Sequence, residues 1–313
     1  MAKLSPDYLD LESISLLSST KIFSVDDFLL ADIDKIVLNS KLTAEDALRL
    51  KHTFSINYSS CPSNAWDLFS LKDKDMFIKT HVEGIDKILS GGILKGSLLE
   101  LCGPSGCGKT QICHSLAVNC AIDSVIVDFV DTKGDFSASR CNILLPAGLK
   151  DEEMDDILDH INVYSSQNIY ELISVLEKIH TNLKRGIKGK DKLLIIDSIT
   201  VPYLPFIGIP SSKGISLLNY ISAKLKQMAT EHNIVVVLTN LGVIFNENEE
   251  DHVGSNIQEV KPLMGKYWQH IPNTRIIITR DADAIKRRMI VQKSDYLAVN
   301  TSTTITISRT GVS

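Results

Sequence analysis

The sequence lacks the patterns that mark membrane and secreted proteins. Its most apolar run, 234–238, is far too short to span a bilayer, and the first ten residues hold no basic stretch followed by an apolar one. We therefore expect neither a membrane-embedded nor a secreted protein. The six cysteines form no Cys-x-x-Cys pair, which argues against a zinc site, and reduced thiols suit an intracellular protein.

An excess of basic residues is also missing. Asp and Glu number 38 against 33 Lys and Arg, which gives a formal net charge of -5, whereas nucleic-acid binders usually carry excess positive charge. Any contact with DNA must therefore be local or depend on a partner. Proline and glycine are few, and 44% hydrophobic residues with 23% charged residues fit a globular protein. The 313 residues suffice for one large domain and a small one.

The first part of the chain, 1–58, has no strand pattern and predicts a small all-α domain. Ser24 and Thr43 each precede acidic residues, so each offers an N-cap oxygen to a helix with acid in its first turn. Residues 59–79 then mix Ser, Pro, Asn and Asp with two isolated aromatic residues, Trp66 and Phe69, which predicts a linker. The two aromatic side chains could dock onto a partner or onto this protein's own core.

From residue 80 to residue 313, short apolar runs alternate with helical patterns. Buried strands separated by crossover helices predict a mostly parallel sheet, so the expected fold class is α/β. Two final segments, 288–293 and 303–308, would add an antiparallel edge. The predicted strands before them are 98–102, 124–130, 193–196, 234–238 and 275–279, and the predicted helices are 109–119, 151–160, 169–184 and 214–232.

A complete phosphate-binding loop follows the first of these strands and opens a helix, which is the context that this motif requires. Gly103 and Gly108 let the backbone curl so that its N–H groups point at phosphates, and Lys109 reaches the β and γ oxygens. Thr110 would give its hydroxyl to magnesium. We therefore predict that ATP and Mg²⁺ are bound by a loop of Gly103, Pro104, Ser105, Gly106, Cys107, Gly108, Lys109 and Thr110, followed by Gln111.

The ends of two later strands supply the other polar groups of such a site. Asp197 follows the buried run 193–196 and is expected to hold the magnesium through water, although an Asp at this place is also a common helix cap. Thr239 and Asn240 end the next strand, where Asn240 could sense the γ-phosphate or simply form a structural turn.

Three stretches of the sequence resemble one protein family. Residues 81–100, HVEGIDKILSGGILKGSLLE, run into the phosphate loop and Gln111 with the spacing of RecA-type recombinases of eukaryotes and archaea. Residues 261–276, KPLMGKYWQHIPNTRI, resemble the paralogues of the strand-exchange recombinase more than that recombinase itself. Phe129-Val130-Asp131-Thr132 and Ala138-Ser139-Arg140 are similar to the D paralogue in particular.

This resemblance implies a RecA-like ATP-binding core of the P-loop class behind a small helical domain. It further implies a nuclear subunit of a heteromeric paralogue complex, with the C paralogue and the smaller X-ray-repair paralogue as partners. Such a complex promotes homologous recombination repair of double-strand breaks and stalled forks by helping the main recombinase to assemble on single-stranded DNA.

Two departures separate the sequence from a filament-forming recombinase. Recombinases carry a Phe-x-x-Ala plug in the linker, whereas the only match here, 28–31, lies in the helical domain and is better explained by core packing. After the phosphate-loop helix, recombinases place a Glu that activates water, whereas this chain has Lys133 at that position. A protonated lysine cannot serve as that base, so we expect at most weak ATPase activity, unless Asp131 or Asp135 substitutes.

Other functions remain open at this stage. The second hypothesis is an enzyme, a self-assembling DNA-stimulated ATPase that exchanges strands, and a motor-type RecA-fold hexamer is a third. Two loops are expected to face DNA: 201–214 is apolar with only Lys213 charged, and the one after Asn240 is acidic, so we expect weak binding to single-stranded or branched DNA. The candidate phosphate contacts, each of which is better explained as a solvated surface residue, are Lys261, Lys266, Arg280, Lys286, Arg287 and Arg288.

Overall fold

The computed structural model describes residues 3–6, 8–58, 64–66, 76–185, 191–208, 212–245 and 259–313. By its internal contacts the chain divides into two units, one of residues 1–74 with 178–187 and one of residues 75–177 with 188–313. The predicted boundaries did not assign 178–187 to the first unit. Most of the predicted linker, including Phe69, lies outside the described residues, and Trp66 is 70% exposed.

The first unit contains four described helices before the linker: α1 (Leu11–Ser19), α2 (Val25–Leu30), α3 (Ile33–Leu38) and α4 (Ala44–Asn57). Ser24 accepts from the backbone N–H of Asp27, whose carboxylate accepts from Ser24 in return, and Thr43 accepts from the N–H of Asp46. The sequence prediction of both N-caps is therefore confirmed. The small core centres on Phe28 and Phe54, whose rings pack edge to face at 5.4 Å between centroids.

The second unit is built around a ten-stranded sheet in the order β12-β11-β10-β9-β3-β7-β6-β4-β5, with β8 paired to β7. The pairs from β9 through β5 are parallel, and β9, β10, β11 and β12 pair antiparallel. The expected α/β class with an antiparallel edge is thus confirmed. The strands are β3 (Leu98–Gly103), β4 (Ile126–Asp131), β5 (Ile161–Ser165), β6 (Lys192–Asp197), β7 (Val235–Phe245), β8 (Glu259–Pro262), β9 (Thr274–Arg280), β10 (Lys286–Ser294), β11 (Ser302–Ser308) and β12 (Gly311–Val312).

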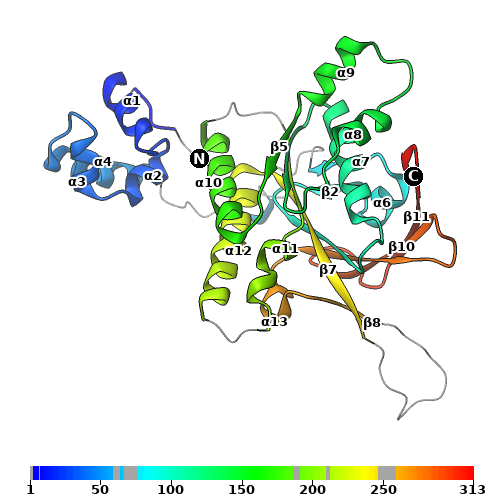
Figure 1. Cartoon of the computed structure of the whole chain (residues 1–313). Helices are drawn as coiled ribbons and strands as arrows, with labels where there is room; N and C mark the ends of the chain where they lie inside the picture. Colours follow the sequence, from blue (N-terminus) through cyan, green and yellow to red (C-terminus); the bar gives the residue numbers. More distant parts are fainter. Residues whose placement is uncertain are drawn as a thin grey trace. The chain divides into compact units, whose positions relative to one another are not determined.

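Helices cover both faces of this sheet (Figure 1). Helices α7 (Lys109–Ile122), α8 (Ala138–Leu144) and α9 (Asp151–Leu158) lie on one face. Helix α12 (Ser212–His232) and residues 169–177, the part of α10 (Ile169–Arg185) that belongs to this unit, lie on the other. Right-handed crossovers explain this, because the chain moves toward the β5 edge through α7 to α9 and returns through α10 and α12. Among the described residues, no helix is long and apolar enough to cross a membrane. The short elements are β1 (Phe77–Ile78), α6 (Glu83–Ile88), β2 (Ile93–Leu94), α11 (Thr200–Tyr203), η1 (Leu204–Phe206) and α13 (Gly265–Trp268).

One buried ion pair joins β3 to β9 inside the second unit. Glu100 is completely buried, and its carboxylate accepts from the Nε of Arg275, which is 3% exposed. Trp268 Nε1 and Asn240 Nδ2 donate to the same carboxylate at 2.7 and 2.5 Å. Because a buried charge is stable only when it is paired and hydrogen bonded, these partners explain why Glu100 can occupy the core.

Arg275→Met is expected to destabilise the second unit by about 3–5 kcal/mol, since it leaves the Glu100 carboxylate buried without its cation. Adding Glu100→Gln to that variant should restore part of the loss. Urea unfolding followed by circular dichroism measures both effects. Lys286→Met, at an exposed ion pair with Asp283, is the control and should change stability little. Equal effects of Arg275→Met and Lys286→Met would contradict this role of the buried pair.

Candidate nucleotide-binding site

The phosphate loop connects the end of β3 to the start of α7, as the sequence predicts. A Cβ atom on Gly103 would lie 2.2 Å from the carbonyl oxygen of Ile278 on β9. Gly108 has a φ of 99°, and its Cβ would lie 2.2 Å from Ile307 Cδ1. A side chain at Gly103 would therefore clash with the backbone of β9, whereas at Gly108 the left-handed φ is what disfavours any other residue.

Two arginines from the neighbouring strands hold the outside of this loop. Arg280 Nε donates to the carbonyl oxygen of Gly106 at 3.1 Å, and Arg287 Nε donates to that of Cys107 at 3.0 Å. Arg287 is only 6% exposed. The sequence-based suggestion that Arg287 contacts DNA is therefore wrong, because its guanidinium is buried against the protein's own backbone. Lys261, Lys266, Arg280, Lys286 and Arg288 are exposed.

The loop borders a pocket of about 510 Å³, within the size range of small-molecule sites. Six of the predicted ligands line it, whereas Gly103, Pro104, Cys107, Asn240 and Asp197 are not among the lining residues. Asp135, which the sequence suggested as a substitute base, also lines the pocket. Five further lining residues were not predicted from sequence: Ser198, Thr200, Val201, Leu204 and Leu241. The predicted residues that line the pocket are Ser105, Gly106, Gly108, Lys109, Thr110 and Gln111, and Lys133 lines it as well.

Lys109 and Gln111 are both held by hydrogen bonds at the rim of the loop. The Lys109 ammonium donates to the carbonyl oxygens of Gly103 and Pro104 at 2.7 and 2.8 Å. Gln111 Oε1 accepts from Arg140 Nε at 2.8 Å. Arg140 belongs to the Ala-Ser-Arg motif at the start of α8, so this motif supports the loop from the adjacent helix.

Lys133 lies between the two predicted metal ligands. Its ammonium is 2.8 Å from Asp197 Oδ1, 3.1 Å from Thr110 Oγ1 and 3.4 Å from Asp135 Oδ2. Asp197 is 1% exposed and also accepts from Thr239 Oγ1 at 2.5 Å. Burial would lower the pKa of Lys133, but the charge and hydrogen bond of Asp197 outweigh burial and raise that pKa above its ordinary value. The cation that the sequence places here is therefore firmly protonated.

Asp131 shapes the turn that carries Lys133. Its Oδ1 accepts from the backbone N–H groups of Lys133, Gly134 and Asp135, and its Oδ2 accepts from that of Phe136. Burial tends to raise the pKa of Asp131, but these four hydrogen bonds lower it below the ordinary value. A carboxylate used in this way is a poor proton acceptor, so Asp131 is not placed to substitute for the missing glutamate.

Asn240 does not end its strand as the sequence suggested, because β7 continues to Phe245; it is buried in the middle of that strand and is not a lining residue of the pocket. Its side chain donates to Glu100, as described, and accepts from Thr200 Oγ1 at 2.6 Å. Thr200 in turn accepts from the N–H of Leu241 at 3.0 Å and lines the pocket. In this arrangement Asn240 supports the pocket through Thr200, and its predicted contact with the γ-phosphate stays a prediction.

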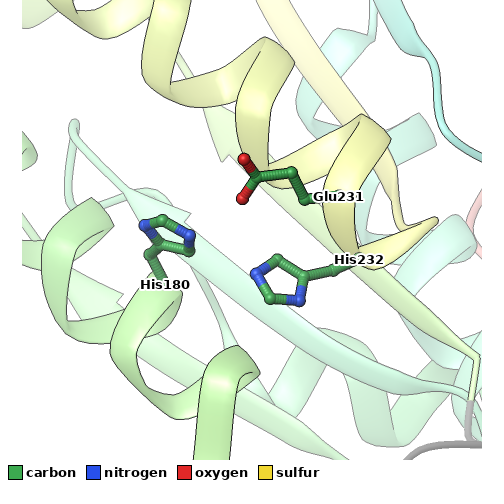
Figure 2. A group of neighbouring side chains, drawn as sticks. All are labelled: His180, Glu231 and His232. Carbon is green, nitrogen blue, oxygen red and sulfur yellow. The ribbon is translucent and has the colours of Figure 1, made fainter. Parts of the chain in front are cut away.

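Figure 2 shows a second group of side chains whose chemistry suits a metal ion, His180 on α10 with Glu231 and His232 at the end of α12. Two imidazoles and one carboxylate are a common zinc ligand set. His180 belongs to the first unit, whereas Glu231 and His232 belong to the second. Because the three side chains are divided between two units that are described separately, we assign no metal to this group.

The two loops that were expected to face DNA are only partly described. The first includes α11 and η1, in which Val201 and Leu204 line the pocket, and Lys213 in α12 is exposed. The acidic loop with Glu247, Glu249, Glu250 and Asp251 lies outside the described residues.

Comparison with known proteins agrees with this architecture. The family model named Rad51 matches residues 72–313. DNA repair protein RAD51 homolog 4 of Mus musculus is 30% identical over 273 residues, which cover 85% of this chain and 80% of that protein. Its namesake in Bos taurus is 27% identical over 273 residues, with 85% and 81% covered. The probable DNA repair protein RAD51 homolog 4 of Dictyostelium discoideum is 25% identical over 321 residues, with 88% and 87% covered.

Asp131→Asn is expected to destabilise the protein by about 1–3 kcal/mol at pH 7, because the amide loses the charge and one of the two acceptor oxygens that the turn uses. The pKa of Asp131 in the folded protein lies below the ordinary value of 3.8, so this stabilisation is present above that value. It is lost as the pH falls through the lower folded pKa.

Urea unfolding of the native protein and of Asp131→Asn between pH 7 and pH 3 measures this effect. The control is Asp155→Asn at an exposed position, whose free energy of unfolding should equal that of the native protein at every pH. A difference between native protein and Asp131→Asn that stays constant across the whole pH range would contradict the account of the turn.

Proposed function

Because the chain belongs to the Rad51 family, we propose that it is an ATP-binding subunit of a recombinase-paralogue complex that acts in homologous recombination repair. The observation that supports this most strongly is the complete phosphate loop, with Lys109 and Thr110 in one pocket beside the end of β6. The similar proteins of mouse, cattle and Dictyostelium are named as DNA repair proteins. We place this chain in the nucleus on the same ground.

Binding of a nucleoside triphosphate follows from the polarity of the loop. The N-terminus of α7 presents unpaired backbone N–H groups and a positive partial charge to the pocket, and both favour phosphate. The ammonium of Lys109 adds a full positive charge beside them. Ser198 and Thr200 add hydroxyl groups to the lining of the same pocket.

Hydrolysis of the bound ATP should be slow. A positioned general base contributes roughly 10² to 10⁴-fold to such a reaction, and no described carboxylate is well placed to act as one. Lys133 is a cation, Asp131 is engaged by the backbone, and Asp135 lies beside the Lys133 ammonium at 3.4 Å. ATP would then act as a ligand that stabilises one conformation of the subunit rather than as a fuel.

The alternative function, a self-assembling strand-exchange ATPase, has less support. The only Phe-x-x-Ala match begins at Phe28, which is completely buried in the core of the helical unit and packs against Phe54. A side chain in that position cannot serve as a plug for a neighbouring molecule without unfolding its own unit. We therefore propose assembly with other paralogues, the C paralogue and the smaller X-ray-repair paralogue, and weak binding to single-stranded or branched DNA.

ATP at about 100 times its dissociation constant is expected to stabilise the native protein by about 2.7 kcal/mol through mass action. The melting temperature, measured by intrinsic fluorescence, should rise accordingly. Lys109→Ala should abolish the rise, whereas Lys226→Ala, at an exposed position on α12, should keep it. Equal shifts in the native protein and Lys109→Ala would show that the nucleotide binds elsewhere.

Co-expression with candidate paralogues tests the assembly. Size-exclusion chromatography with light scattering should find this chain in a defined heteromeric complex, and electron microscopy should find no filaments when the chain alone is mixed with single-stranded DNA. Regular filaments formed by this chain alone would instead support the strand-exchange alternative.

A further inference from the structure

We infer that the Lys133 ammonium takes the place of the magnesium ion, so that this protein binds nucleoside triphosphate free of divalent metal. The inference rests on the proposed binding of ATP and specifies the ionic form in which ATP is bound. Thr110 and Asp197 are the oxygen donors that would hold magnesium in this pocket, and both are hydrogen bonded to Lys133 instead.

The residues around Lys133 do not fit a magnesium ion as they stand. Magnesium needs near-octahedral oxygen ligands at about 2.0–2.1 Å. The Thr110 hydroxyl oxygen already accepts from the Lys133 ammonium at 3.1 Å, and Asp197 Oδ1 already accepts from both Lys133 and Thr239. One lone pair of the Thr110 hydroxyl and both of those on Asp197 Oδ1 are therefore engaged, and the ammonium beside them would repel a second cation in contact with it.

The backbone of Lys133 is anchored next to Asp197, which distinguishes it from a mobile surface lysine. The N–H of Thr132 donates to the carbonyl oxygen of Asp197 at 3.0 Å. Thr132 Oγ1 donates to the carbonyl oxygen of Ser198 and accepts from the N–H of Ser198, both at 2.8 Å. On the other side, the Asp131 carboxylate binds the N–H of Lys133 itself. Two strand ends thus set the direction from which the ammonium enters the pocket.

Two lysine ammonium groups then supply the positive charge of the site without a metal ion. Lys109 and Lys133 both line the pocket with their ammonium groups. Lys109 directly precedes Thr110 in the chain, and the Lys133 ammonium lies 3.1 Å from the Thr110 hydroxyl oxygen. Asp197 is neutralised by its contact with Lys133 at 2.8 Å, so it does not repel phosphate oxygens. A triphosphate without its metal carries more negative charge than the magnesium complex, and an additional fixed ammonium is the complementary partner for it.

The test compares ATP affinity with magnesium and with a chelator. A fluorescent ATP analogue is titrated with the native protein, and anisotropy is read in excess Mg²⁺ and in excess EDTA. We expect the two dissociation constants of the native protein to agree within about threefold, and Lys133→Met to bind at least about tenfold more weakly in EDTA than in Mg²⁺. Lys226→Met is the matched control and should behave as the native protein does.

A second readout can overturn the inference with the native protein alone. Electron paramagnetic resonance of Mn²⁺ should detect no ion immobilised by the native protein with ATP, whereas Lys133→Met with ATP should immobilise one. A native protein whose affinity falls by tenfold or more in EDTA, or which immobilises Mn²⁺, would overturn the inference even if Lys133→Met failed to fold. A native protein that binds no nucleotide in either buffer would instead refute the proposed function.

Discussion

Parallel pairing of β3, β4, β6 and β7 is the constraint on which the site depends. The register aligns Asp131 with Asp197 across β4 and β6, and Gly103 with Leu241 across β3 and β7. Since the strands run in one direction, their carboxyl ends reach the same edge of the sheet, where the chain turns into helices. The phosphate loop, the Lys133 turn and the α11 segment meet there for that reason alone, although they are far apart in sequence.

Within that arrangement, the contact between Lys133 and Asp197 changes what the common P-loop architecture can do. A carboxylate at the end of β6 and a hydroxyl at the start of α7 are suited to a divalent ion, whereas a lysine fixed between them supplies its own positive charge. By the resemblance to recombinases, the same position would otherwise hold the carboxylate that activates water. We therefore propose that nucleotide binding is separated from hydrolysis in this subunit.

Much of this architecture could be predicted from sequence, because the phosphate loop, Asp197 and the buried apolar runs are local patterns. Strand β5 was missed, since Ile161–Ser165 is a short edge strand whose side chains are partly or fully exposed and follow no clean alternation. Arg287 was misjudged because its charge suggested solvent, whereas three backbone carbonyl oxygens hold its guanidinium inside the fold. The contacts of Asn240 with Glu100 and of Lys133 with Thr110 join residues 140 and 23 positions apart, and no local pattern reveals such pairs.

The most direct measurement of the central claim is an experimental structure of the protein grown with a non-hydrolysable ATP analogue in excess Mg²⁺. We expect the Lys133 ammonium to remain within hydrogen-bond distance of Thr110 Oγ1 and Asp197 and to contact a phosphate oxygen, with no octahedral ion between β6 and the phosphate loop. An octahedrally coordinated magnesium bound to the Thr110 hydroxyl, with Lys133 turned away from Asp197, would contradict it.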